Sequence, residues 1–250
     1  LIVGDEILSG KRQDKHLTKV IELLRERGLE LAWVRMASDD AQDIAEAVAW
    51  GHARGDVVLS CGGIGATPDD CTRQGAALAF GVAIERHPEA SALIISQYGP
   101  QGSERRLIMA EFPVGAGLIP NPVNRVAGFF YADCNFVPGF PEMAWPMLEW
   151  VLDQRYAHLH RSEPDVEFSL RVVGTTSEGD LLPLMEDTLK RYAGIRLSSL
   201  PTRGDANTPR QIEFGFKGRA ALAAEAYRYF RSHMIELPGV TTEDLRPPAG

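Results

Sequence analysis

Three glycines and two adjacent carboxylates lie within one short segment, and their types and spacing suit the binding of phosphate and a metal ion. Gly62, Gly63 and Gly65 have no Cβ, so the backbone can take positive φ angles and direct N–H groups at phosphate oxygens. Asp69 and Asp70 follow closely, and a carboxylate beside a phosphate is repulsive unless a cation lies between them. The segment predicts a phosphate cradle in which at least one of these acids binds metal or acts in catalysis. Asp is also a favoured helix cap, and Asp69 is the more plausible cap of the following helix.

Carboxylates also follow the first two predicted strands. Asp5 and Glu6 come after the first strand, and Asp39 and Asp40 come after the second. The carboxyl ends of parallel strands share one edge of a sheet, so these side chains are expected on the same rim as the glycine segment. Each acid taken alone is more commonly a turn or cap residue, but together they suit Mg²⁺ or a similar hard cation.

The elements that position these residues alternate between strand and helix. Short apolar, β-branched runs predict strands, and 3.6-residue periodicity predicts the helices between them, one of which has Leu17, Val20, Ile21 and Leu24 on one face. This βαβαβα order predicts a parallel sheet with right-handed crossovers. The expected strands are 1–3, 29–36 and 57–60, and the expected helices are 13–27, 38 to about 54, and 70–80.

The chain from 87 to 156 is less regular. A helix over 87–108 is expected to break at Tyr98-Gly99-Pro100, and residues 111–125, rich in Gly, Pro and Asn, are expected to form a wall of the binding site. Residues 129–131 and 135–137 predict a hairpin, and 143–156 predict another helix.

The sequence predicts two domains. Residues 1–156 form the α/β domain, and 157–165 read as a linker. A strand–helix–strand–strand–helix unit over 166–237 predicts a small α+β domain of ferredoxin-like or KH-like character. Residues 238–250 are expected to be a flexible tail.

The composition limits the classes of partner. A net charge of −8 over 250 residues argues against nucleic acid, and Gly174–Ser177 lacks the loop pattern of an RNA-binding KH domain. No apolar run is long enough to span a bilayer. Three dispersed cysteines, Cys61, Cys71 and Cys134, favour a cytoplasmic location and carry no catalytic role.

Five segments together resemble the molybdopterin-binding domain of molybdenum-cofactor biosynthesis proteins, and most of all the amino-terminal part of competence/damage-inducible (CinA-type) proteins. They are GDEILSG (4–10), SDD (38–40), CGGIGATPDDCT (61–72), IPNPVN (119–124) and VPGFPEM (137–143). The resemblance implies a three-layer α/β fold with a mostly parallel sheet, and residues 166–235 resemble the small middle domain of CinA-type proteins. It also implies metal-dependent chemistry on a nucleotide or pterin pyrophosphate, as in splitting ADP-ribose or FAD. The alternatives are adenylyl transfer to molybdopterin and a non-catalytic pterin or nucleotide carrier.

The resemblance places the catalytic acids at Asp70 and Asp39. It implies a divalent metal such as Mg²⁺, with molybdopterin as a possible ligand, no membrane partner, and a homo-oligomer, either dimer or trimer. Arg73, Arg105 and Arg125 are further candidates for phosphate contact. The expected metal ligands are Asp70, Asp69, Asp39, Asp5 and Glu6, and the expected ligand contacts are Gly62, Gly63, Ile64, Gly65, Ala66, Thr67, Thr72, Gly4, Asn121, Pro138 and Gly139.

Overall fold

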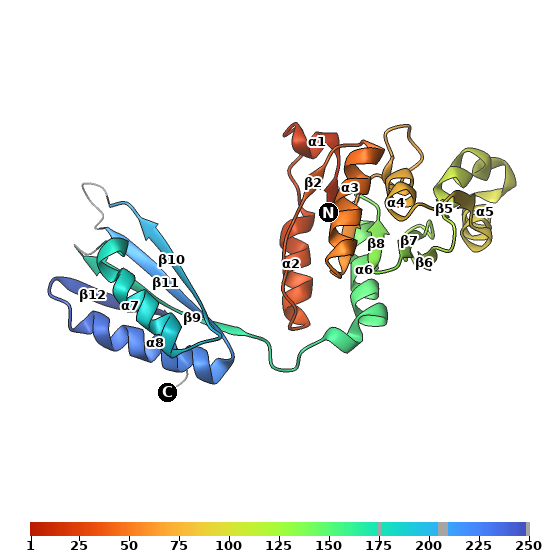
Figure 1. Cartoon of the computed structure of the whole chain (residues 1–250). Helices are drawn as coiled ribbons and strands as arrows, with labels where there is room; N and C mark the ends of the chain where they lie inside the picture. Colours follow the sequence, from red (N-terminus) through yellow and green to blue (C-terminus); the bar gives the residue numbers. More distant parts are fainter. Residues whose placement is uncertain (175–176, 205–209, 249–250) are drawn as a thin grey trace. The chain divides into compact units, whose positions relative to one another are not determined.

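The computed structural model of the chain describes residues 1–174, 177–204 and 210–248. The middle of the Gly174–Ser177 segment and the last two residues of the expected tail lie outside these ranges. The chain divides into two compact units, Leu1–His160 and Arg161–Gly250, which are described separately (Figure 1).

A six-stranded sheet forms the centre of the first unit, in the order β2-β1-β3-β8-β7-β6. The first four strands in this order are parallel to one another, and β7 and β6 continue the sheet antiparallel. The chain reverses its direction of travel across the sheet between β1 and β3, and ligands of open α/β sheets bind at such a switch point. The strands are β1 (Ile2–Val3), β2 (Met36–Ala37), β3 (Val58–Cys61), β6 (Gly117–Ile119), β7 (Gly128–Tyr131) and β8 (Cys134–Val137).

Helices cover both faces of this sheet, which gives three layers (Figure 1). One apolar cluster joins α2 and α6 to the sheet, and another joins α3 and α4 to the opposite face. The predicted fold class is confirmed. No helix of the described residues is long and apolar enough to cross a membrane. The helices are α1 (Asp5–Leu8), α2 (His16–Glu26), α3 (Ala41–Ala53), α4 (Thr72–Phe80), α5 (Pro88–Ser103) and α6 (Pro141–Trp150), with a π-turn at Val151–Arg155 and 3₁₀ turns at Glu104–Ala110 and Ala157–Leu159.

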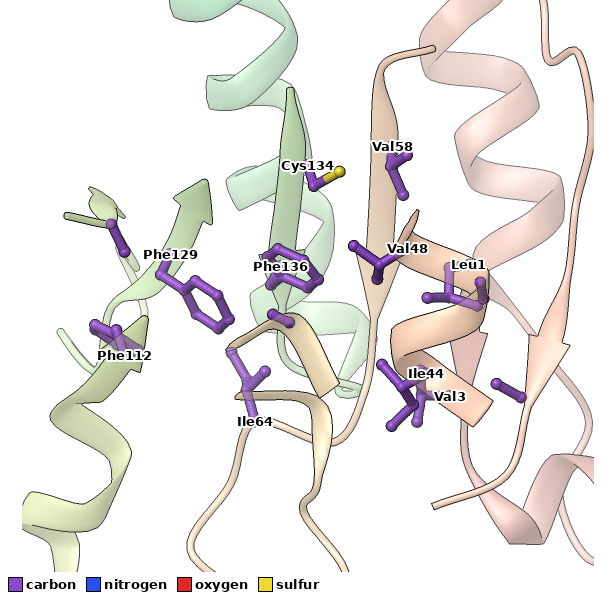
Figure 2. Close-up of a cluster of buried hydrophobic side chains, with 14 of the residues drawn as sticks. Leu1, Val3, Ile44, Val48, Val58, Ile64, Phe112, Phe129, Cys134 and Phe136 are labelled. Carbon is purple, nitrogen blue, oxygen red and sulfur yellow. The ribbon is translucent and has the colours of Figure 1, made fainter. Parts of the chain in front are cut away.

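The period of two along the central strands divides the core between these faces. Val58 and Phe136 belong to the cluster under α3 and α4, whereas the next residue on β8, Val137, belongs to the cluster under α2 and α6. Phe129 stacks on Phe136 with ring centroids 4.5 Å apart. Figure 2 shows that Ile64, from the loop after β3, points its side chain into this core.

Several predicted elements differ from the structure. The strand expected over 29–36 shrinks to β2: of residues 29–35, Arg35 accepts a hydrogen bond from the Ile2 N–H of β1 at 2.9 Å, and Trp33 packs on Trp50 of α3. On α2 the buried face is His16, Val20, Leu23 and Leu24, and Ile21 is exposed.

The segment between α4 and α6 holds strands that the sequence did not predict. The antiparallel pair β4 (Ile84–Arg86) and β5 (Glu111–Pro113) joins the two ends of the α5 region, and β6 pairs with β7. The break expected near Gly99 is confirmed, since Gly99 has φ 73° inside α5. The expected hairpin is β7 and β8.

The second unit is a four-stranded antiparallel sheet in the order β10-β11-β9-β12, with α7 and α8 packed on it. This is the βαββαβ order of a ferredoxin-like fold. The expected flexible tail is wrong for residues 240–246, because they form β12, which pairs with β9, and Asp244 accepts hydrogen bonds from Tyr227 and Arg231 of α8. The elements are β9 (Val166–Gly174), α7 (Glu178–Arg191), β10 (Arg196–Thr202), β11 (Gln211–Gly218), α8 (Ala220–Ile235) and β12 (Val240–Arg246).

Candidate functional site

The candidate site is the edge of the first sheet where the loops after β1, β3 and β8 meet. Gly62 has φ 108°, and a Cβ there would lie 2.2 Å from the carbonyl oxygen of Val3 at the end of β1. On the other side, a Cβ on Gly139 would lie 3.4 Å from the Gly62 Cα, and the Gly62 N–H donates to the Val137 carbonyl at 3.0 Å. The three loops are therefore in direct backbone contact, and glycine is required where they are closest.

The loop after β3 is held from beneath by the first turn of α4. Thr72 is buried, its hydroxyl donates to the Gly62 carbonyl at 2.9 Å, and its N–H donates to the Gly63 carbonyl at 2.9 Å. Thr72 was expected to contact the ligand, but its hydroxyl faces inward and shapes the loop. A Cβ on Gly63 would lie only 2.3 Å from that hydroxyl oxygen, so the close approach also requires glycine at this position.

The same loop presents a row of N–H groups that the protein does not use. Within the described ranges, no acceptor is hydrogen-bonded to the N–H of Gly63, Ile64, Gly65 or Ala66. The N-cap of α4 is Cys71, and no side chain caps this helix. Successive free N–H groups beside an uncapped helix N-terminus form a site for an anion such as phosphate.

Asp70 is bound within the loop rather than at the helix terminus. Its Oδ2 accepts hydrogen bonds from the N–H of Thr67 at 2.8 Å and from the Thr67 hydroxyl, and it lies against Gly65, where a Cβ would be 2.5 Å away. The remaining carboxylate oxygen, Oδ1, makes no hydrogen bond within the described residues. The suggestion that Asp69 caps the helix is wrong, since Cys71 occupies the N-cap. Thr67 thus contributes to the cradle by holding Asp70.

Asp5 and Asp39 form a reciprocal pair across the ends of β1 and β2. The Asp5 N–H donates to Asp39 Oδ2 at 2.8 Å, and the Asp39 N–H donates to Asp5 Oδ1 at 3.4 Å. Burial raises the pKa of Asp39, and electrostatic repulsion from Asp5, Glu6 and Asp69 adds to the rise. These four carboxylates are therefore close enough to interact electrostatically. Asp40 is the N-cap of α3, accepting from the N–H groups of Gln42 and Asp43.

The structure brings only part of the predicted metal set together. In the described part of the chain, no group of three or more His, Cys, Asp or Glu side chains is arranged to hold a metal ion. The oxygen donors of Asp5 and Asp39 nevertheless fit Mg²⁺, which commonly takes one or two carboxylates and completes its shell with water and substrate phosphates. A magnesium site here therefore needs the phosphate of a ligand.

The other residues predicted to contact the ligand, Gly4, Asn121 and Pro138, lie in three separate loops. Gly4 directly follows β1 and is the N-cap of α1, and a Cβ there would lie 2.6 Å from a Glu6 carboxylate oxygen. Asn121 is buried and is used inside its own loop, accepting from the Val123 N–H at 3.0 Å and donating to the Val126 carbonyl at 3.1 Å. Pro138 lies between Val137 and Gly139, in the loop that touches Gly62.

Two buried polar residues support the site in a way that was not predicted. Arg73, expected to contact phosphate, is 1% exposed and donates through Nη1 to the carbonyls of Ile64 and Gly65. Burial lowers the pKa of its guanidinium. His16 is also buried, and its Nε2 is 3.1 Å from the Gly139 carbonyl. Helical spacing could have indicated that both side chains are buried. Arg73 and His16 each lie three, four or seven positions before apolar residues on the buried face of their helix.

Arg73→Met is expected to destabilise the protein by about 2–4 kcal/mol, because it leaves two loop carbonyls without their charged donor. Equilibrium unfolding in urea measures the change. Arg105→Met is the matched control, since Arg105 is exposed and its loss is expected within about 0.5 kcal/mol of zero. Equal stability of the two variants would show that Arg73 does not hold the loop.

Comparison with known proteins agrees with this architecture. The model of the family described as "Probable molybdopterin binding domain" matches residues 1–158. The chain is 36% identical over 210 residues to a CinA-like protein of Citrifermentans bemidjiense, covering 79% of this chain and 49% of that protein, so it spans about half of that relative. It is 30% identical over 217 residues to a protein of Pyrobaculum arsenaticum, covering 83% of this chain and 80% of that protein.

A solved structure shows the same likeness in three dimensions. The protein CinA with unknown function from Thermoplasma acidophilum superposes with a TM-score of 0.56 at 28% identity, covering 61% of this chain and 94% of that chain. The family model covers more than half of the chain, and both the sequence relatives and this structure include CinA proteins. The chain belongs to the molybdopterin-binding domain family and is of CinA type.

Proposed function

We propose that the chain binds a nucleotide or pterin pyrophosphate at the loop after β3 and hydrolyses it with a divalent metal ion. The observation that carries the proposal is the row of four unused N–H groups, Gly63 to Ala66, at the switch point of the sheet. Such a row binds phosphate oxygens without requiring a charged side chain. The acidic pair beside it supplies oxygen donors for a cation that offsets repulsion between carboxylate and phosphate.

Each part of the rim has a separate task in this hydrolysis. The N–H groups of 63–66 bind the phosphate oxygens, and Asp5 with Asp39 would hold the metal. When bound, the metal supplies charge neutralisation and a template for the pyrophosphate. The free oxygen of Asp70 orients a water molecule toward phosphorus and accepts its proton. Attack by that water breaks the bridging P–O bond and leaves two phosphate monoesters.

Product analysis tests this activity. ADP-ribose, FAD and ATP are incubated with the protein and Mg²⁺, Mn²⁺ or Co²⁺ in ¹⁸O-labelled water. The expected products are AMP with ribose 5-phosphate, or AMP with FMN, and one phosphate of each pair carries the label. The absence of turnover for every substrate and metal would contradict the proposal.

The family description names molybdopterin binding, and we propose adenylyl transfer to molybdopterin as the second candidate. The same rim would bind ATP, and the attacking group would be a pterin phosphate in place of water. The two reactions are separable because transfer consumes ATP only when the pterin is present. Tight binding in a calorimeter without either reaction would indicate a carrier of pterins or nucleotides.

Asp39→Asn is expected to raise the stability of the metal-free protein at pH 7. Since burial raises the pKa of Asp39 above its ordinary 3.8, the folded protein holds that proton more tightly than the unfolded chain. The ionised Asp39 carboxylate therefore destabilises the folded protein above its raised pKa. This destabilisation disappears as the pH falls below that pKa and the carboxylate is protonated. Because the side chain is partly exposed, the expected gain is below about 1 kcal/mol.

Thermal unfolding at pH 7 and near pH 4 measures this difference. Wild type and Asp39→Asn should differ at pH 7 and converge at the lower pH. Added Mg²⁺ with pyrophosphate should raise the melting temperature of wild type and not that of the variant. Glu46→Gln, which removes one exposed charge from α3, is the control. A lower melting temperature for Asp39→Asn would show that its contact with Asp5 outweighs the cost of burial.

A further inference from the structure

The His16 side chain makes a specific contact with the loop after β8. It is 7% exposed, and its Nε2 lies 3.1 Å from the Gly139 carbonyl oxygen. Since a carbonyl oxygen only accepts, Nε2 carries the proton and donates. Asp14 fixes the start of α2, because it accepts from the N–H groups of His16 at 3.0 Å and Leu17 at 2.9 Å. The imidazole therefore extends from a helix whose first N–H groups are held by Asp14, and it contacts the Gly139 carbonyl.

The other ring nitrogen has no partner. Nδ1 of His16 is buried and makes no hydrogen bond within the described residues. Buried polar atoms are normally paired, so an apolar side chain at this position would suit the stability of the helix better. The observation that accounts for a histidine here is the bond from Nε2 to Gly139.

Gly139 connects this bond to the phosphate cradle. A Cβ on Gly139 would lie 3.4 Å from the Gly62 Cα, so the two residues are neighbours, and the Gly62 N–H donates to the Val137 carbonyl, two residues before Gly139. Glycine places little restriction on its own φ and ψ, so the Gly139 peptide has no local reason to keep one orientation. The N–H row of the cradle begins at the next residue after Gly62.

We infer that His16 is a positioning residue for the phosphate site. Its Nε2–H fixes the Gly139 carbonyl, the fixed loop supports Gly62, and Gly62 sets the direction of the N–H groups at 63–66. The inference rests on the proposed function for the identity of the ligand, but the contact between His16 and the loop is independent of it. Sites held by a rigid second layer bind more tightly than sites whose support is loose.

Two side chains separate the hydrogen bond from the packing. Gln at position 16 can place its Nε2 donor where the histidine Nε2 lies, whereas Leu fills the space and donates nothing. Inorganic pyrophosphate with Mg²⁺ is the probe, and calorimetry measures its dissociation constant. His16→Leu is expected to weaken binding by about five- to tenfold, and His16→Gln to restore most of it. His160→Leu is the matched control, because His160 Nε2 lies 3.1 Å from the Leu152 carbonyl, away from the cradle.

Amide hydrogen exchange without ligand gives a second readout. Faster exchange of the amides of Gly62, Gly139, Phe140 and residues 142–144 in His16→Leu, and not in His160→Leu, is expected. Unchanged exchange in folded His16→Leu, or equal weakening by Leu and Gln, would overturn the inference. If wild type binds no pyrophosphate, the proposed function fails and exchange alone decides the role of His16. If the Leu variant does not fold, His16→Gln is compared with His16→Asn instead. The Asn side chain is one bond shorter, so its amide donor does not reach the Gly139 carbonyl.

Discussion

Asp70→Asn is expected to lower the turnover of ADP-ribose or FAD by about 10²–10³-fold with little change in stability. The loop contact survives, because the amide oxygen of Asn can still accept from the Thr67 N–H, now 2.8 Å from Asp70 Oδ2. Asp70 Oδ1, which makes no hydrogen bond to the residues that the structure describes, is replaced by an NH₂ group, which can neither bind a cation nor accept a proton from water. The loss should therefore appear in kcat more than in the affinity for pyrophosphate.

The assay compares steady-state kcat and KM of wild type and variant under saturating Mg²⁺ or Mn²⁺. Glu46→Gln removes one carboxylate from the exposed face of α3 and should leave both constants within about twofold of wild type, as a surface substitution does. If Asp70→Asn keeps more than a tenth of wild-type turnover, Asp70 holds the loop and takes no part in the chemistry.

The elements that the sequence predicted well are those whose determinants are local. Asp40 caps α3 through the N–H groups two and three residues later, and that pattern can be recognised in a few residues of sequence. The break of α5 at Gly99-Pro100 and the hairpin of β7 and β8 follow from equally short patterns. The glycine loop was predictable for the same reason, because its conformation requires Gly62 and Gly63 at positive φ.

The elements that the sequence missed depend on partners far along the chain. β12 is polar and lies at a sheet edge, so its residues show no apolar run, and within the described ranges it pairs with β9 alone. Residues 29–35 have the alternation of a strand, but Trp33 is drawn to Trp50 and donates to Asp56 at 2.8 Å. The expected acidic cluster also depended on side-chain directions, which strand order alone does not determine.

The helical spacing of Arg73 and His16 places both on a buried helix face, but their roles were not predicted from it. Arg73 shares a helix face with Ala76, Ala77 and Phe80, and His16 shares one with Val20 and Leu23. From the sequence, Arg73 was interpreted as a phosphate contact and His16 was given no role. Both side chains can be buried because each donates a hydrogen bond to a loop carbonyl. That carbonyl reaches the side chain only in the folded protein, so the local sequence does not reveal it.

Gly62→Ala is expected to destabilise the first unit by about 3 kcal/mol or more, among the largest effects of any single substitution in the site. The φ of 108° is itself unfavourable for a residue with a Cβ, at about 1–2 kcal/mol. The added methyl group would also lie 2.2 Å from the Val3 carbonyl oxygen. That atom is backbone in the neighbouring strand and cannot rotate away, so β1 and β3 must separate at the switch point. Urea unfolding followed by tryptophan fluorescence measures the loss.

Gly81→Ala separates the two contributions to this loss. Gly81 also has positive φ, at 64°, but a Cβ there would meet no atom within 4 Å. Its cost is therefore the backbone term alone, about 1–2 kcal/mol, and the excess at Gly62 measures how tightly β1 and β3 are joined at the site. Equal losses in the two variants would mean that the strand ends can move apart freely. A cradle with such freedom could not hold its N–H groups in a fixed row, so the result would count against pre-organised phosphate binding as well as against the predicted stability effect.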